Sequence, residues 1–242
     1  MKFGFGVNPL HTTPQVTAAG LLLYLDASNP ASYPTSGNTW TDLIGGKVFT
    51  LYNTPTFSTA NGGYLNFNAS NQWADTPTSL PELSNWTVEV WHYYTGTNTG
   101  VVPTIVTEAY LQGGSYGINY VLGASGNSTS NTNLAASFYV GGGGWVNTNT
   151  SYALPATNAW YHIVGTSDGT TLKVYVNGNL VQSAAIGGFS STSNQSGIRL
   201  MRRWDAGDYW GGRLASVKIY NAALPLSDVS ANWNNGKTKF GL

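Results

Sequence analysis

The sequence predicts an all-β domain, an antiparallel sandwich of two sheets, and two observations lead to this prediction. The 242 residues include 30 Gly, 15 Tyr and 9 Trp but only 8% charged residues, where about 25% is usual in globular proteins. This composition is typical of many short strands joined by Gly, Asn and Ser turns. Apolar and polar residues also alternate with period 2 in several segments, and the sequence shows no long amphipathic helix. A chain of this length can bury a core as a single domain without disulfides or metals.

The chain begins with an irregular segment, residues 1–19, which contains Gly4, Gly6, Pro9 and Pro14 and has no periodicity. We expect either a disordered tail or an arm that docks on a neighbouring subunit or a larger assembly. Residues 20–242 are expected to form the domain. The strands expected in its first part are residues 21–27, 40–43, 47–51, 64–67, 86–94, 102–108, 116–122 and 134–140.

The alternation is clearest in residues 86–94, where Trp86, Val88 and Val90 fall on one face. Glu89 falls on the other face, and we expect it to be an outward-facing polar residue at the sheet surface. His92 lies in the same strand. It is expected to be a sheet-surface residue or a core histidine with its hydrogen bonds satisfied.

Residues 160–183 predict a three-stranded meander with one buried face, which would carry Leu172, Val174 and Val176. Asp168–Gly169 and Asn177–Gly178 are hairpin turn signals because both dipeptides tolerate positive φ.

A last strand is expected at residues 212–220, followed by a short helical turn near residues 224–235 that Ser227 could cap. Trp86, Trp160 and Trp210 occur in strand patterns, so we assign them to packing.

Charge and composition exclude several classes of protein. The formal net charge is zero and there is no basic stripe, so electrostatically driven nucleic-acid binding is excluded as a main role. The absence of cysteine excludes disulfides and thiolate metal sites. No apolar run is long enough for a signal peptide or for membrane insertion. We therefore expect a protein of cytoplasmic origin or one exported without a classical signal, and a virus particle component meets both conditions.

Four segments resemble laminin G-like domains of the concanavalin A-like lectin/glucanase superfamily. They are WYHIVGTSDGTTLKVYVNGNLV, GGRLASVKIYNAALPLSDVSANWN, GLLLYLDASNPASYPTSGNTWTDL and GGYLNFNASNQW. The resemblance covers roughly residues 20–236 and implies an antiparallel two-sheet jelly-roll β-sandwich. The resemblance is closest to versions of this domain seen in tailed-phage and other viral structural proteins. The ending NNGKTKFGL also resembles those phage versions.

The residues required for hydrolysis are not found in a suitable pattern. Glycoside hydrolysis needs two carboxylates across a groove, and the related jelly-roll endoglucanases carry Glu-x-Asp-x-x-Glu on one strand. The Glu residues here are Glu82, Glu89 and Glu108, and none fits that pattern. No Gly-x-Ser-x-Gly turn presents a nucleophile near His11, His92 or His162. We predict a protein that is not an enzyme.

A structural calcium ion is an alternative to having no cofactor, because laminin G-like domains often bind one at the sandwich rim. Positions that are often Asp in relatives look like Asn68 and Ser216 here, which weakens this expectation. Asp205 and Asp208 are the best remaining pair of carboxylate ligands. The alternative is that both are turn residues bonded to their own backbone.

Sugar binding needs an aromatic platform beside hydrogen-bonding polar residues. Three places have this chemistry: the expected loops at residues 141–150 and 202–210, and Trp73 beside Asn71 and Gln72. The candidate ligand-binding residues are Trp145, Asn147, Asn149, Trp204, Asp205, Asp208, Tyr209 and Trp73. If these residues are exposed, they could equally anchor a protein–protein interface.

The sequence therefore predicts a non-enzymatic phage or viral structural accessory protein of a tail, fibre or capsid, with a lectin-like surface for glycan or host-surface attachment. The expected partners are other virion proteins or further copies of this chain, together with a possible cell-surface glycan. Two alternatives remain open: a purely architectural capsid decoration protein without a ligand, and a polysaccharide-degrading enzyme. The expected location is the virion, with a secreted or cell-surface location as the alternative.

Overall fold

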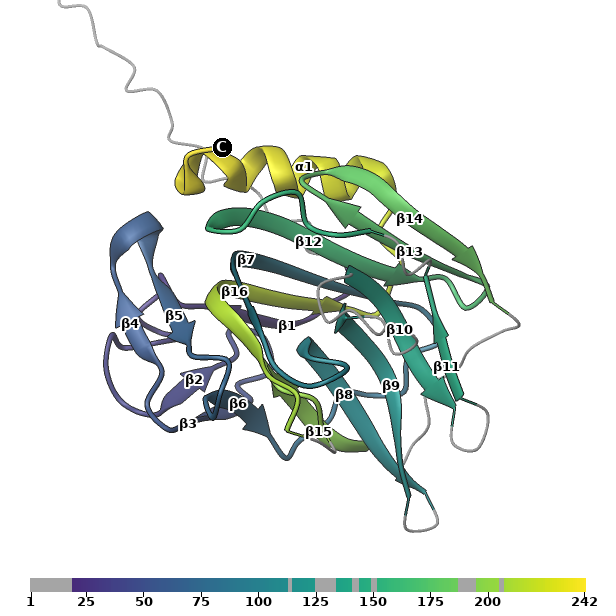
Figure 1. Ribbon diagram of the computed structural model, residues 1–242, viewed down its shortest axis with the longest axis horizontal. Helices are drawn as coiled ribbons and strands as arrows, with labels where there is room; N and C mark the ends of the chain where they lie inside the picture. The colour runs from purple at the N-terminus through teal and green to yellow at the C-terminus, as the bar shows by residue number, and fades with distance from the viewer. Residues whose placement is uncertain are drawn as a thin grey trace, which may run out of the picture.

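The computed structural model describes residues 19–112, 115–124, 134–140, 144–148, 152–186, 195–204 and 207–242. These residues form two antiparallel sheets of eight strands each, packed face to face as a jelly-roll sandwich (Figure 1). The predicted fold class is confirmed. The expected N-terminal arm, residues 1–19, lies outside the described residues except for Ala19.

The first sheet has the order β14-β13-β12-β7-β16-β5-β4, and β1 also pairs with β16. Its strands are β1 (Leu21–Asp26), β4 (Thr56–Ser58), β5 (Tyr64–Phe67), β7 (Trp86–Asn98), β12 (Ala159–Ser167), β13 (Thr171–Val176), β14 (Asn179–Ala185) and β16 (Trp210–Tyr220). One half of β16 pairs with β1 and the other half with β5. The last strand of the chain therefore lies in the middle of this sheet.

The second sheet has the order β11-β10-β9-β8-β15-β6-β3-β2. Its strands are β2 (Thr39–Thr41), β3 (Val48–Tyr52), β6 (Trp73–Thr76), β8 (Thr104–Gln112), β9 (Ser115–Ala124), β10 (Leu134–Val140), β11 (Gly144–Asn147) and β15 (Gln195–Leu200). The sequence did not predict β4, β6, β11 or β15 as strands. Residues 144–147 in particular form an edge strand where we expected a loop.

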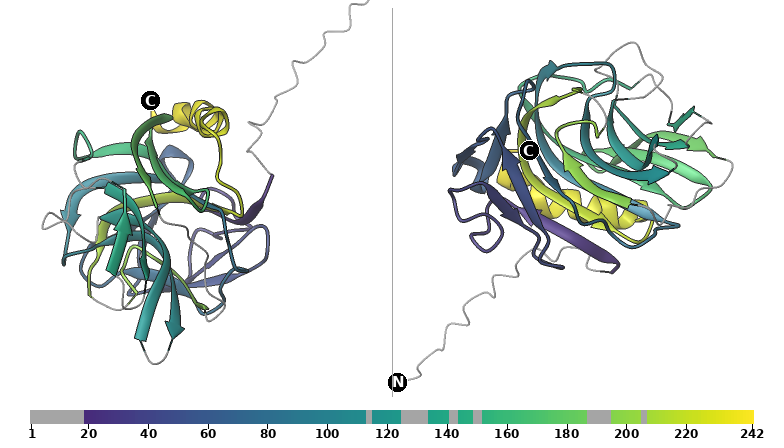
Figure 2. Two further views of the ribbon diagram at one scale, coloured as in Figure 1. Left: turned by 90° about the vertical axis from the view of Figure 1, so that its right-hand side faces the viewer. Right: turned by 90° about the horizontal axis from the view of Figure 1, so that it is seen from below.

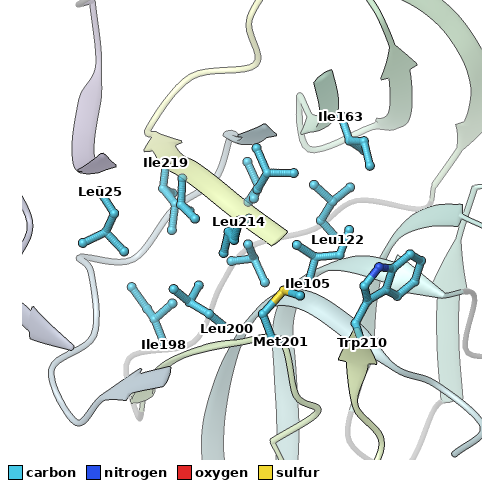
Figure 3. Packing of buried hydrophobic residues seen from close by; sticks show 14 of the residues in the cluster. Leu25, Ile105, Leu122, Ile163, Ile198, Leu200, Met201, Trp210, Leu214 and Ile219 are labelled. Carbon is cyan, nitrogen blue, oxygen red and sulfur yellow. The ribbon is translucent and has the colours of Figure 1, made fainter. Parts of the chain in front are cut away.

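The hydrophobic core fills the space between the sheets. Figure 3 shows side chains of both sheets meeting there, with Ile163 and Ile219 from the first and Ile105, Leu122 and Ile198 from the second. The expected buried face of β13 belongs to this core. Trp86 and Trp210 are fully buried in it, as predicted.

The hairpins differ in how they use their turn residues. Asn177 and Gly178 have φ of 52° and 77°, as a two-residue turn between β13 and β14 requires. Gly169 has φ of 84°, whereas Asp168 stays outside the positive-φ region. The Asp168 carboxylate instead accepts the backbone N–H groups of residues 170 and 171, so this dipeptide begins a three-residue loop.

One α-helix, α1 (Leu226–Gly236), and the 3₁₀ turn η2 (Lys237–Phe240) cover the outer face of the first sheet (Figures 1 and 2). The other 3₁₀ turn of the described residues, η1 (Ala60–Gly62), leads into β5. Pro225 is the N-cap residue of α1, so Ser227 lies within the first turn and is not the cap that the sequence suggested. Phe240 packs on Trp91 and Trp160 with ring centroids 4.4 Å and 4.5 Å apart. Trp160 is thus buried as predicted, but under η2 instead of between the sheets.

The helix also explains why the expectation for Glu89 was wrong. Glu89 is on the outer face of β7, yet only 1% of it is exposed because α1 covers it. Its carboxylate accepts hydrogen bonds from Lys218 Nζ at 2.7 Å and from Asn232 Nδ2 of α1 at 2.7 Å. His162 Nε2 lies 3.2 Å from the same carboxylate. A residue expected at the sheet surface is therefore the centre of a buried polar network.

Replacing Gly236 of α1 by alanine is expected to destabilise the protein. A Cβ there would lie 2.5 Å from Trp91 Cζ2, closer than real contacts allow. Gly236→Ala should lower the free energy of unfolding by about 1–3 kcal/mol through overpacking, although Gly→Ala normally stabilises a helix by about 1 kcal/mol. Urea unfolding measures the change. Ala231→Gly on the exposed face of α1 is the control and should cost about 1 kcal/mol; a stabilised Gly236→Ala variant would contradict the tight packing of α1 on Trp91.

Candidate functional site: an aromatic cluster on the second sheet

The candidate site lies on the outer face of the second sheet, where β3, β6 and β15 pair side by side. Leu51, Ala74 and Leu200 point into the core. Because side chains alternate along a strand, their neighbours Tyr52 and Trp73 point outward. These two residues are direct register partners. Their rings stack with centroids 4.5 Å apart and planes 9° apart.

Arg202 and Tyr209 complete what we call the aromatic cluster, namely Tyr52, Trp73, Arg202 and Tyr209. The Arg202 guanidinium lies 4.6 Å from the centroid of Trp73 and 5.3 Å from that of Tyr209. A backbone bridge pairs Arg202 with Tyr209, so the loop after β15 places them together. All four side chains are half-buried. Such arginine–aromatic contacts are worth about 0.5–2 kcal/mol each and hold the cluster in a fixed arrangement.

A second arginine contact adjoins the cluster. Arg199 Nη2 lies 3.0 Å from Asp75 Oδ2, and its guanidinium lies 4.4 Å from the Trp204 ring centroid. Arg199 Nη1 also donates to the Trp204 carbonyl oxygen at 2.7 Å. Burial lowers the pKa of Arg199, although Asp75 opposes this shift. Burial and then the Asp75 carboxylate raise the pKa of Tyr52, so its phenol stays protonated near neutral pH.

Asp208, a candidate ligand-binding and metal-binding residue, lies beside the cluster and is largely buried. Only 8% of it is exposed. Its Oδ2 accepts the Val102 N–H at 2.9 Å and lies 3.1 Å from Arg203 Nη1. Gly100 packs so closely against Asp208 that no Cβ would fit there. In this structure Asp208 joins two loops beside the cluster.

The structure brings together some of the predicted site residues and separates others. Trp73, Trp204 and Tyr209 lie in or beside the aromatic cluster. Trp145 and Asn147 lie on β11, at the far edge of the same sheet. Five strand spacings separate β11 from β6, about 24 Å, so the two places are not one binding site. Asn149 and Asp205 lie outside the described residues.

The calcium expectation can be compared only with the part of the chain that the structure describes, which leaves out Asp205 of the candidate pair. No three His, Cys, Asp or Glu side chains there lie close enough to hold an ion together. Asn68, one of the positions that departs from the calcium pattern, uses its Oδ1 to accept the N–H groups of Ser70 and Asn71. Within the same residues, no helix has the length and apolar character needed to cross a membrane.

The sequence prediction missed Tyr52, Asp75, Arg199 and Arg202 as members or neighbours of the site. Their proximity depends on the register between β3, β6 and β15, which are distant in sequence. The one local signal was Arg202, which lies within three residues of the candidates Trp204 and Asp205.

Two antiparallel sheets of eight strands each, packed face to face, are the architecture of a concanavalin A-like β-sandwich protein. A model of the concanavalin A-like lectin/glucanases superfamily matches residues 62–230, more than half of the chain. The chain belongs to this superfamily. Among curated proteins, no sequence matches it significantly.

Solved structures support the fold. One similar structure is domain 4 of AbnA, a GH43 extracellular arabinanase from Geobacillus stearothermophilus, in complex with arabinotriose. It matches this chain with a TM-score of 0.68 and 19% identity, over 88% of this chain and 97% of that one. The type G botulinum neurotoxin receptor binding domain has a TM-score of 0.62 and 15% identity over 89% of this chain. Trypanosoma rangeli sialidase in complex with sialic acid has a TM-score of 0.61 and 16% identity over 91% of this chain. This chain spans 51% of the toxin domain and 33% of the sialidase. These similarities show the fold alone.

Proposed function

We propose that this protein is a non-enzymatic accessory protein of a phage or viral particle that attaches to a glycan or host surface through the aromatic cluster. The observation that carries the proposal is the fixed group of half-buried rings and guanidinium around Trp73. Aromatic side chains cover the apolar faces of sugars, and arginine donates to their hydroxyls. The neighbouring Asp75 and Trp204 extend the same surface.

The positions of the three glutamates support a binding role over hydrolysis. Glu89 lies under α1 on the outer face of the first sheet, and Glu108 is fully buried in the second sheet. Glu108 pairs in register with the core residues Tyr120 and Ile198, so it lies between the sheets. Glu82 is exposed in the loop before β7. These three glutamates therefore do not flank a common groove, which glycoside hydrolysis would require.

The particle role is supported by the resemblance of the strand and helix segments to viral structural proteins. In this proposal residues 1–19 dock on other virion proteins or on further copies of this chain, and the aromatic cluster faces outward. Repeated copies would raise the avidity of a weak site by about 10²–10⁴-fold. Deleting residues 1–18 should abolish particle attachment and leave glycan binding by the free domain intact.

A glycan array tests the binding role. Wild-type protein should show saturable binding to at least one glycan, and Trp73→Ala and Arg202→Ala should each weaken it at least about tenfold, since each loses a central contact. Ile44→Ala, at an exposed apolar position that is not part of the cluster, is the control and should bind like the wild type. Repeating the array with calcium and with chelator tests the alternative of a structural calcium ion, whose removal should weaken binding if Asp205 takes part.

Other results would contradict parts of this proposal. Binding that is lost only in Trp145→Ala would move the site to β11. If no glycan binds while truncation of residues 1–18 still abolishes particle attachment, the protein is an architectural decoration protein. Turnover of a glycan that vanished in Glu89→Gln would show an enzyme.

A further inference from the structure

A pocket of about 460 Å³ lies on the other sheet, between the outer face of β1 and β16 and the covering elements α1 and η2. Its lining includes Asp26, Trp91, Lys218, Asn232 and Phe240. This volume falls in the range of about 300–1,000 Å³ that small-molecule sites occupy. The pocket is separate from the aromatic cluster, because β1 and β16 belong to the first sheet and the cluster lies on the second sheet. Figure 1 shows α1 on the side of the first sheet that faces away from the second sheet.

The charges at this pocket cancel in pairs. Lys218 Nζ, on the floor, lies 2.7 Å from Glu89 Oε1. Lys239 Nζ, in η2, lies 3.9 Å from Asp26 Oδ1. The two ammonium groups and two carboxylates sum to zero, so a ligand of either charge would gain little net attraction. This balance favours a neutral ligand.

The polar groups of the wall are held in place before any ligand arrives. Asp26 Oδ2 accepts the Tyr24 hydroxyl at 2.9 Å, and Asp26 Oδ1 accepts the Ser28 N–H at 2.9 Å. Lys218 is fixed by Glu89, which uses one of the three N–H donors of its ammonium. Preorganised donors and acceptors of this kind bind hydroxyl groups at a low entropic cost.

An apolar wall adjoins these groups. Trp91 and Phe240 line the pocket and stack on each other with centroids 4.4 Å apart and planes 19° apart. Ser216 lines the same space. We propose that this pocket binds a neutral, hydroxyl-rich small molecule of monosaccharide or disaccharide size. Its C–H faces contact the aromatic wall, and its hydroxyls bond to Asp26, Lys218 and Lys239.

Saturation-transfer NMR on the full chain tests this assignment, with methyl glycosides of glucose, galactose, mannose and arabinose as neutral probes. Glucuronate and N-acetylneuraminic acid are the charged comparators. At least one neutral glycoside should bind saturably. Ser216→Leu fills the pocket and should abolish this binding, whereas Lys239→Met should weaken it about three- to tenfold. Lys237→Met, on the same turn but outside the pocket, is the matched control and should leave the affinity unchanged.

A further variant distinguishes sugar binding at this pocket from glycan binding at the aromatic cluster. Trp73→Ala should leave binding at this pocket intact, so a failure of the aromatic cluster as a glycan site does not affect the result. The proposal is overturned if no neutral glycoside binds, or if the charged sugars alone bind. It is equally overturned if Lys239→Met, with wild-type unfolding behaviour, retains full affinity, or if Trp73→Ala removes the binding.

Discussion

Glu108→Gln is expected to stabilise the protein at pH 8 and to flatten the dependence of its stability on pH. Glu108 is fully buried between the sheets, where its Oε1 accepts the Leu80 N–H at 3.0 Å. Burial raises the pKa of Glu108 to about 8. Between its ordinary pKa and pH 8 the unfolded chain ionises this group while the folded protein keeps it protonated. The wild type should therefore lose stability as the pH rises through this window, by about 4–5 kcal/mol for this shift.

Urea unfolding at a series of pH values from 5 to 9 measures this effect. Glutamine keeps a carbonyl oxygen for the Leu80 N–H and removes the titration, so the gap between variant and wild type should widen as the pH rises. Glu82→Gln, at an exposed position, is the control and should follow the wild-type curve. Parallel curves for Glu108→Gln and the wild type would show that Glu108 does not titrate in this range.

Lys218→Met is expected to cost about 3–5 kcal/mol of unfolding free energy at neutral pH, because it leaves the Glu89 carboxylate buried without its cation. Burial alone would raise the pKa of Glu89, but Lys218 and then His162 outweigh it and hold this pKa well below its usual range. The stability that this ionised carboxylate contributes is present above its ordinary pKa and is lost as the pH falls. Its pH dependence is thus opposite to that of Glu108.

Chemical denaturation of three variants distinguishes the effect of losing the Lys218–Glu89 ion pair from general effects of packing. The double variant Glu89→Leu/Lys218→Met has no unpaired charge, so it should be more stable than Lys218→Met alone. Lys239→Met breaks the longer and more exposed pair with Asp26 and should cost less than about 1 kcal/mol. If Lys218→Met were equally harmless, the buried ion pair would contribute nothing to stability.

Local sequence patterns predicted the parts of the fold that depend on local chemistry. The alternation in residues 86–94 placed Trp86 in the core, and Asn177–Gly178 marked a turn whose positive φ values the structure shows. The strands that were not predicted are short or interrupted. β6 has four residues with Asp75 among them, and β15 contains Gly197 and Arg199, which weaken the strand signal.

The candidate site was only partly predicted, because its residues come from separate elements. Trp73 lies on β6 and Tyr52 on β3, whereas Arg202 and Tyr209 lie between β15 and β16. Trp73 and Tyr209 could be named from their residue types and neighbours. Tyr52 could not, because its contact with Trp73 depends on the register between β3 and β6. The burial of Glu89 likewise depends on α1, which is more than a hundred residues later in the chain. These contacts arise from tertiary pairing, and a single sequence does not reveal them.

The central position of β16 also has a consequence for how the protein folds during synthesis. β7 is complete at residue 98, but its neighbour β16 begins only at residue 210. The first sheet can therefore not close while the ribosome is still translating the intervening residues. The outer face of β7 must wait further, until Phe240 of η2 has emerged. Long-range pairing of this kind slows folding, so the nascent chain exposes Trp91 and Trp160 until these later segments are made and should depend on chaperones during that interval.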